Sequence, residues 1–266
     1  MRKPLLLIKA LLTHLLRSLL KGRIKSKRIS GSKMVLHYDK SQHLMFLGKK
    51  KIRYEKNIQH KLSGLIKFGD LIFDIGANIG QYTLFFSEGV GPDGHVVSVE
   101  PGKDNFKMLR FNVESNGCSN ITTINAGIAA EEGDRVLYLD TLTGGRKSSF
   151  FAETMGKNYE GKSENVPVMG FGSLLERFGT PDLVKIDVEG AESDVMNGIK
   201  SFSVKTIFLV EVSDTSKNDI LERFTKENYQ CYCAESADFK LIEGIEGVPD
   251  GINNFLFMPS ARLSER

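Results

Sequence analysis

Residues 71–80 read LIFDIGANIG, and this stretch decides the fold. An apolar run ends at Asp74 and Ile75 and leads into a turn that contains Gly76 and Gly80. An amphipathic stretch follows the turn. A short apolar run before glycines is typical of a buried strand, and the stretch after it is typical of a helix. The pattern predicts a strand, a turn and a helix, with a ligand at the turn.

The spacing of the acid and the glycines indicates what the turn binds. It reads Asp-x-Gly-x-x-x-Gly, whereas dinucleotide-binding enzymes carry Gly-x-Gly-x-x-Gly. Gly76 and Gly80 would let a ligand approach the backbone closely, and the N–H groups at the start of the helix suit a carboxylate. Asp74 suits an ammonium group rather than a pyrophosphate. S-adenosylmethionine (SAM) carries an ammonium, a carboxylate and a sulfonium, so we expect SAM as the cofactor.

Charge is distributed unevenly along the chain. Residues 1–38 contain ten of the 36 Lys and Arg residues and no Asp or Glu, which leaves 26 basic and 33 acidic residues elsewhere. Phosphate binding needs a basic face, so the acidic remainder argues against a nucleic-acid partner. The cysteines Cys118, Cys231 and Cys233 have no framework or zinc-site spacing. We interpret Cys231 and Cys233 as buried thiols on one strand face, with a redox or metal role as the alternative.

Residues 1–28 have the pattern of a basic amphipathic helix, to which we assign residues 1–30. The apolar run is too short to span a bilayer well, and it lacks the small-residue cleavage site of a signal peptide. Two interpretations stay open, contact with a membrane surface or packing on the domain or a second subunit. We therefore expect a cytoplasmic protein, with peripheral membrane contact through this segment as one alternative.

Residues 31–69 are predicted to form an appendage. Residues 34–38 and 43–46 read as two strands of a hairpin, and residues 53–67 have the apolar periodicity of a helix. The main domain is assigned to residues 70–266, and the 41% apolar content of the chain is enough for its core.

Strands and helices alternate along the main domain, which indicates an α/β fold with a mostly parallel sheet covered on both faces. Residues 135–140 suggest a further short strand, and residues 141–165 are predicted to be a polar loop or lid. The predicted core strands are 71–75, 95–100, 121–125, 183–188, 206–212, 229–234 and 254–258, and the helices are near 80–88, 104–115, 191–199 and 218–227.

Ligands of open α/β sheets bind beyond the carboxyl ends of the strands, so the residues there are the candidates for chemistry. Glu100 is placed to accept hydrogen bonds from both ribose hydroxyls. Phe106 or Ile128 could flank an adenine, although core packing is the favoured role of Phe106. Acids also cap helices and order loops, so each has a structural alternative. The polar residues at the predicted strand ends are Asp74, Glu100, Asn125, Asp187, Glu189 and Glu211.

At these residues the sequence resembles the FkbM family of SAM-dependent methyltransferases, over most of residues 65–257. The matching segments are residues 73–80, Val99-Glu100-Pro101, Asn105-Phe106, Leu109, Asn112, Ser148-Ser149, residues 183–192 (LVKIDVEGAE) and Val210-Glu211-Val212. The resemblance implies a Rossmann-like, doubly wound, seven-stranded sheet whose last strand is antiparallel. It also implies transfer of a methyl group from SAM to a hydroxyl of a sugar, glycan or small natural product.

The resemblance assigns the cofactor site to one group of residues. The predicted cofactor-binding residues are Asp74, Gly76, Ala77, Asn78, Gly80, Glu100, Pro101 and Asn105. One departure is visible upstream of the fourth core strand. Residues 169–174 read MGFGSL where the family usually carries a Thr-Leu-Asp-Asp-like run, so any acceptor role of that aspartate is absent or altered.

A hydroxyl acceptor benefits from a base within hydrogen-bond reach. Asp187 and Glu189 are the first candidates for this catalytic role, followed by Glu211. The three carboxylates could alternatively hold a divalent metal, which we do not favour, or cap and order loops. Two other classes stay open, a nucleotide-dependent oxidoreductase and a non-catalytic, membrane-associated SAM-binding module.

Overall fold

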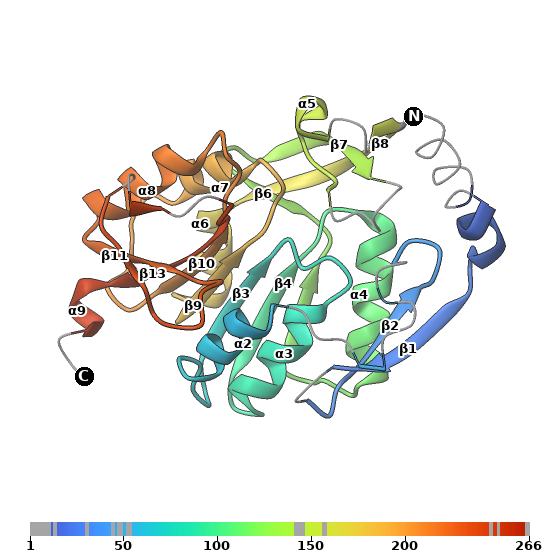
Figure 1. Ribbon diagram of the computed structural model, residues 1–266, viewed down its shortest axis with the longest axis horizontal. Helices are drawn as coiled ribbons and strands as arrows, with labels where there is room; N and C mark the ends of the chain where they lie inside the picture. Colours follow the sequence, from blue (N-terminus) through green and yellow to red (C-terminus); the bar gives the residue numbers. More distant parts are fainter. Residues whose placement is uncertain are drawn as a thin grey trace, which may run out of the picture.

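The protein is described from a computed structural model (Figure 1). The structure describes residues 12, 15–29, 32–43, 46, 50–51, 55–140, 147–155, 159–244, 247–248 and 251–263.

A single mixed sheet forms the centre of the molecule. Its strands lie in the order β12-β11-β13-β10-β9-β3-β4-β5. The bounds are β3 Leu71–Ile75, β4 His95–Val99, β5 Ile121–Ile124, β9 Leu183–Ile186, β10 Ile207–Glu211, β11 Tyr229–Cys233, β12 Leu241–Ile242 and β13 Asn254–Pro259. The five strands from β10 to β5 are parallel neighbours, and β13 is antiparallel between β10 and β11. The predicted α/β fold with an antiparallel last strand is confirmed, and the two-residue β12 adds an eighth strand.

Helices cover both faces of this sheet, so the fold is doubly wound (Figure 1). One face packs against α6 (Phe171–Phe178), α7 (Glu192–Gly198) and α8 (Lys217–Lys226). The other packs against α2 (Lys56–Ser63) and α3 (Gln81–Val90), and α4 (Lys103–Ser115) covers the edge near β5. Helix α6 was not predicted, although its apolar residues Phe171, Leu174, Leu175 and Phe178 have helical spacing.

The alternation of side chains along β3 decides what each face receives. Phe73 and Ile75 join the cluster under α6 to α8, whereas Ile72 joins the cluster under α2 and α3. Asp74 therefore points to the same face as Ile72, where α3 covers it completely. The direction in which Asp74 points determines how it takes part in the site.

A second sheet lies beside the carboxyl ends of the central strands. Its order is β6-β8-β7, with β6 Gly127–Ala129, β7 Gly133–Asp140 and β8 Tyr159–Gly170, and the helix α5 spans Ala152–Met155. The predicted strand at 135–140 is confirmed as part of β7. The predicted loop at 141–165 is wrong over 159–165, because those residues pair with β7, and the polar residues 161–165 are exposed or half-buried. Residues 141–146 and 156–158 lie outside the described residues.

The amino-terminal region differs from its prediction. Residues 15–20 are helical, but β1 (Ile24–Arg28) is a strand that pairs with β2 (Val35–Asp39) in antiparallel register. The predicted helix is therefore wrong over 24–28. Strand β2 pairs with β1 where 43–46 had been predicted as its partner; His43 and Phe46 belong to no strand, and residues 44 and 45 lie outside the described residues. Gly22, with a φ of 71°, lies between the helix and β1.

The hairpin of β1 and β2 packs on the main domain beside α4 (Figure 1). Leu36 and Tyr38 are fully buried against Ile79 and Leu84, which explains why this short sheet forms. Residues 1–11, 13 and 14 lie outside the described residues, so membrane contact stays a prediction. Among the residues that are described, no helix has the length and apolar character needed to cross a membrane.

Two of the three cysteines are buried, as interpreted from the sequence. Cys231 and Cys233 lie on the core-facing side of β11, Cys118 is half-buried, and all three are free thiols. Burial raises the pKa of the Cys231 thiol to about 12, which makes it a poor nucleophile.

Candidate active site

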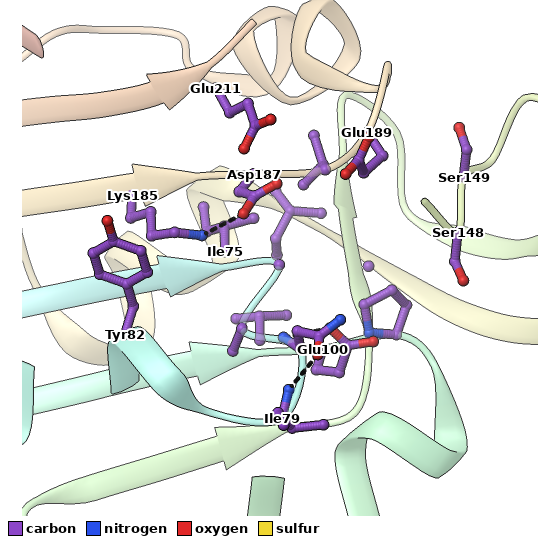
Figure 2. Close-up of a pocket in the computed structure, with 18 of the residues that line it drawn as sticks. Ile75, Ile79, Tyr82, Glu100, Ser148, Ser149, Lys185, Asp187, Glu189 and Glu211 are labelled. Atoms are coloured by element: carbon purple, nitrogen blue, oxygen red, sulfur yellow. Dashed lines mark hydrogen bonds and ion pairs between the residues drawn. The ribbon is translucent and has the colours of Figure 1, made fainter. Parts of the chain in front are cut away.

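A cavity opens at the carboxyl ends of β3, β4, β9 and β10, and the segment 148–150 closes one side of it (Figure 2). Its volume, with the open mouth included, is about 1030 Å³. Its lining combines apolar side chains with a few polar groups, which is typical of a small-molecule site. Of the predicted site residues, the cavity is lined by Gly76, Ala77, Asn78, Glu100, Pro101, Asp187, Glu189 and Glu211, and it is not lined by Asp74, Gly80 or Asn105.

The turn after β3 has three residues in the left-handed region. Gly76, Asn78 and Gly80 have φ angles of 78°, 51° and 92°. A Cβ on Gly76 would lie 1.8 Å from the carbonyl oxygen of Asp187, and a Cβ on Gly80 would lie 2.7 Å from Leu109 Cδ1. Both positions therefore have an internal reason to be glycine. The sequence argument had attributed the glycines to close approach of a ligand.

Glu100 forms the wall opposite the acids of β9 and β10 (Figure 2). Its Oε2 accepts a hydrogen bond from the Asn78 backbone N–H at 2.8 Å, and its Oε1 accepts one from Gly102 at 2.9 Å. Burial raises the pKa of Glu100 to about 7, although these bonds and one from Asn105 lower it. With three of about four acceptor sites used, the carboxylate keeps capacity for a ligand hydroxyl.

The other residues predicted to lie near the cofactor beyond β4 and β5 have distinct positions. Asn105 lies behind the carboxylate and hydrogen-bonds to it. Asn125 Nδ2 donates to the carbonyl oxygens of Glu100 and Pro101 at 2.8 and 2.9 Å, and so fixes the loop after β4. Of the two candidates to flank an adenine, Ile128 lines the cavity, whereas Phe106 packs against the cluster under α4.

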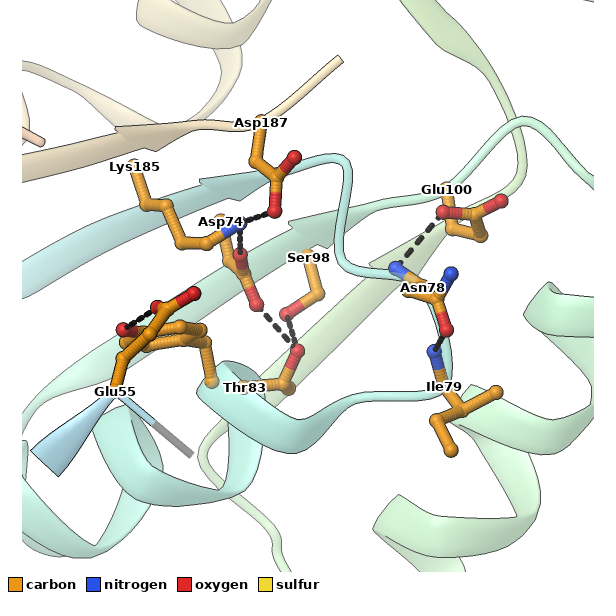
Figure 3. Close-up of polar contacts among 10 residues, drawn as sticks. Glu55, Asp74, Asn78, Ile79, Thr83, Ser98, Glu100, Lys185 and Asp187 are labelled. Atoms are coloured by element: carbon orange, nitrogen blue, oxygen red, sulfur yellow. Dashed lines mark hydrogen bonds and ion pairs between the residues drawn. The ribbon is translucent and has the colours of Figure 1, made fainter. Parts of the chain in front are cut away.

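Asp74 lies one layer behind the cavity wall (Figure 3). It is fully buried and accepts a hydrogen bond from Thr83 Oγ1 at 2.6 Å. Lys185 Nζ lies 3.7 Å from its other oxygen. Burial raises the pKa of Asp74 and Lys185 opposes that shift. This geometry does not favour the predicted direct contact of Asp74 with an ammonium group, because α3 and Lys185 already surround the carboxylate.

Lys185 is the site residue that the sequence argument missed. Its ammonium also lies 3.0 Å from Asp187 Oδ2 and 5.2 Å from the ring centroid of Tyr82. The Tyr82 hydroxyl donates to Glu55 at 2.5 Å. Burial alone would lower the pKa of Lys185, but Asp187 and Asp74 outweigh it and the pKa is raised. Lys185 is therefore charged, and it ties the acids of two strands together.

The three predicted catalytic acids converge. One carboxylate oxygen from each of Asp187, Glu189 and Glu211 lies within 4.8 Å of the others. Strand β9 ends at Ile186, so Glu189 reaches the cluster from a turn, where its φ is 48°. Burial, and then repulsion from Asp187 and Glu189, raise the pKa of Glu211 to about 8. The cluster is an electronegative site that suits a cation or a base.

These features fit SAM. The N-cap of α3, Gly80, has no side chain to cap the first N–H groups of that helix, and Gln81 of its first turn lines the cavity. Those groups would hold the carboxylate, Glu100 the ribose, and the acid cluster would face the positive charge. The same three acids have the hard oxygens that a divalent metal prefers, but Lys185 already occupies one oxygen of Asp187.

Two more residues missed by the sequence argument line the cavity from the appendage. His43 and Phe46 stack with their ring planes 2° apart and lie near Ile79 of the turn. His43 and Phe46 were predicted only as the two ends of a strand, and no sequence pattern indicated this role, because they meet the turn only after the hairpin has docked on the main domain.

A doubly wound, mostly parallel sheet with an antiparallel last strand, and a cavity between a glycine turn and strand-end acids, define a Rossmann-like methyltransferase fold. The sequence profile of the methyltransferase FkbM domain matches residues 74–231, which is more than half of the chain. The chain belongs to this family, so the predicted resemblance is confirmed.

Two curated relatives carry methyltransferase names. Methyltransferase 1 of Beauveria bassiana (strain ARSEF 2860) is 26% identical over 48% of this chain and 57% of its own length. Methyltransferase sdnD of Sordaria araneosa is 28% identical over 48% of this chain and 60% of its own length. The chain thus spans about three fifths of the relatives it matches. Among solved structures, the methyltransferase FkbM from Methylobacillus flagellatus KT is 16% identical, with a TM-score of 0.48 over 77% of this chain and 48% of that one.

Proposed function

We propose that the protein transfers a methyl group from SAM to a hydroxyl group of a sugar, glycan or small natural product. One observation carries this proposal. The carboxylates of Asp187, Glu189 and Glu211 gather at one side of a cavity whose other side holds Glu100 and the glycine turn. A cofactor on the turn would thus present its reactive end to a cluster able to accept a proton.

SAM supplies a methyl group on a positively charged sulfur. The protein's residues then mainly align the acceptor hydroxyl with that group, and positioning of this kind contributes on the order of 7–11 kcal/mol. Lys185 Nζ lies 3.0 Å from Asp187 Oδ2 and so fixes the position of that carboxylate. Glu211, with a pKa of about 8, is in its ionised form a stronger base than an ordinary carboxylate, which suits removal of a hydroxyl proton. Glu189 faces the same space and positions the acceptor.

The direct test uses the full chain, SAM labelled in its methyl group and a fractionated cell extract. We expect label in a product that carries a new O-methyl group. Replacement of Glu189 by Gln is expected to lower turnover while SAM binding, measured by calorimetry, is retained. Wild-type turnover in that variant would reject a role of Glu189 in catalysis.

Calorimetry also separates the other classes. Binding of NAD in place of SAM would indicate an oxidoreductase. Binding of SAM without label in any product would indicate a non-catalytic module. The same assay with EDTA tests the metal alternative. We expect activity to survive, because Lys185 and the sulfonium of bound SAM already offset the negative charge of the three acids.

A further inference from the structure

A second cavity lies beside the first, with a volume of about 660 Å³ when its open mouth is included. The two cavities share Glu189 and Glu211. The lining residues of the second cavity are Lys147, Glu189, Gly190, Glu192, Glu211, Val212, Ser213 and Asn253. A molecule in this second cavity would therefore reach the two carboxylates from the side away from Glu100.

The segment 147–149 borders both spaces. Lys147 lines the second cavity, while its neighbours Ser148 and Ser149 line the first. The backbone N–H of Lys147 donates to Asp140 Oδ2 at 3.2 Å, and the backbone N–H of Asp140 donates to Ser148 Oγ at 3.0 Å. The end of β7 thus holds this segment at the boundary between the two cavities.

The lining of the second cavity is polar. Val212 is its one apolar side chain among the described residues, and no aromatic ring belongs to the lining that the structure describes. Glu192 is already used, since it accepts hydrogen bonds from the Gly190 N–H at 2.5 Å and from Ser216 Oγ at 3.0 Å. Ser213 Oγ bonds to Ser216 Oγ at 2.7 Å. Besides the shared Glu189 and Glu211, this leaves Lys147 and Asn253 as the polar side chains of the described lining that can bind a ligand.

The charges of this cavity also limit which ligands can bind in it. Three glutamates face one lysine, so an anionic ligand would meet net repulsion. A flat aromatic ligand would find little apolar surface and would leave polar groups without partners, which costs binding energy. A neutral molecule with many hydroxyls can both donate to the carboxylates and accept from Lys147 and Asn253.

We propose that this second cavity is the acceptor site, that it takes a neutral polyhydroxylated ring such as a sugar of a glycoside, and that Lys147 and Asn253 determine this specificity. The inference rests on the proposed methyl transfer. It adds where the acceptor lies, which residues hold it and which charge it carries.

The test uses the full chain with Lys147→Met and Asn253→Leu, and with Lys162→Met as the matched control. Lys162 is an exposed lysine of β8 that lines neither cavity. Labelled SAM is supplied with methyl glucoside and methyl rhamnoside as neutral probes, catechol as a flat aromatic probe and glucuronate as an anionic probe. SAM affinity of every variant is measured by calorimetry.

We expect the neutral glycosides to be methylated in preference to catechol and glucuronate. Each of the two single variants should raise the KM for the glycoside about tenfold, because each loses one hydrogen bond from a charged or amide group. Their SAM affinity should stay at the wild-type value, and Lys162→Met should keep the wild-type KM. Preference for catechol or glucuronate, or an unchanged glycoside KM in both variants, overturns the inference. If none of the probes takes label, the labelled product from cell extract decides: a neutral polyhydroxylated product that the two variants label poorly supports the inference, and an aromatic or anionic product overturns it. Failure to bind SAM, or label in no product at all, instead contradicts the proposed function.

Discussion

Lys185 Nζ lies 3.0 Å from Asp187 Oδ2, and this ion pair joins the cavity to the buried layer behind it (Figure 3). The same ammonium reaches 3.7 Å to Asp74 on the neighbouring strand. Asp74 is fully buried, and Asp187 faces the cavity. One buried charge thus fixes a carboxylate of the site and compensates a carboxylate of the core.

Replacement of Lys185 by Met tests this relationship through stability. The variant leaves Asp74 buried with Thr83 as its hydrogen-bond donor and without a counter-charge, and loss of one partner of a buried pair costs about 3–5 kcal/mol. We expect a loss of that size in the free energy of unfolding, measured by urea titration. The double variant with Asp74→Asn should recover part of it, since the uncompensated charge is then removed. Strictly additive losses in the double variant would contradict the pairing.

The raised pKa of Glu211 predicts a pH dependence of activity. With a pKa of about 8, Glu211 is mostly protonated below that pH and can accept a proton only above it. The kcat/KM for the acceptor should therefore rise with pH through an inflection near 8 that belongs to the coupled acids as a set. The inflection in kcat should lie at a lower pH, because the sulfonium of bound SAM stabilises the ionised carboxylate. Glu211→Gln should remove the inflection, and a variant profile that coincides with the wild type would exclude Glu211 as the base.

The raised pKa of Glu100 predicts that the stability of the ligand-free protein depends on pH. Its pKa is about 7 in the folded state against an ordinary value of 4.5, so between these pH values the folded state binds more protons than the unfolded state. The contribution is therefore fully present below pH 4.5 and is lost as the pH rises to about 7, by about 3 kcal/mol. Urea titrations of wild type and Glu100→Gln at several pH values give the two slopes.

We expect the wild type to lose this stability with rising pH and the variant to lack that fall. Saturating SAM should flatten the wild-type slope, because ribose hydroxyls that donate to the carboxylate lower its pKa. Identical slopes for the two proteins would mean that Glu100 titrates normally in the folded state.

Local patterns were sufficient for the central sheet but not for its additions. Strand β3 was predictable because an apolar run before glycines is a local signal. Strand β8 was not, because its polar residues 159–165 are held by pairing with β7, which no window of the sequence contains. Residues 24–28 continue a basic pattern, and they form β1 because Leu36 and Tyr38 bury one face of β2 beside them.

The site divides in the same way. Asp187, Glu189 and Glu211 were predictable because the carboxyl ends of parallel strands meet at one edge. The burial of Asp74 follows from the period of two along β3, a signal that the sequence contained and that the first interpretation did not use. Lys185 stands in the apolar run 183–186, and a charge in a buried strand requires a partner. The identity of that partner depends on the order of the strands, which only the structure provides.

Gly76 offers a prediction about the backbone of the site. Its φ is 78°, and an added Cβ would lie 1.8 Å from the backbone oxygen of Asp187, which neither a rotamer change nor a side-chain shift can relieve. Gly76→Ala should therefore displace the segment that follows β9, and with it the acid cluster. We expect a loss of several kcal/mol in the free energy of unfolding, at the upper end of single substitutions, together with loss of SAM binding.

Gly172→Ala is the matched control. Gly172 lies in α6, no atom beyond its chain neighbours and its own helix backbone lies within 4 Å of its added Cβ, and alanine favours a helix by about 0.5–1 kcal/mol over glycine. Thermal unfolding followed by circular dichroism should thus show a higher Tm for Gly172→Ala and a much lower Tm for Gly76→Ala. If Gly76→Ala kept both the wild-type Tm and its affinity for SAM, the close contact between the glycine turn and β9 would not exist in solution, and the acids of the site would have to be held in another way.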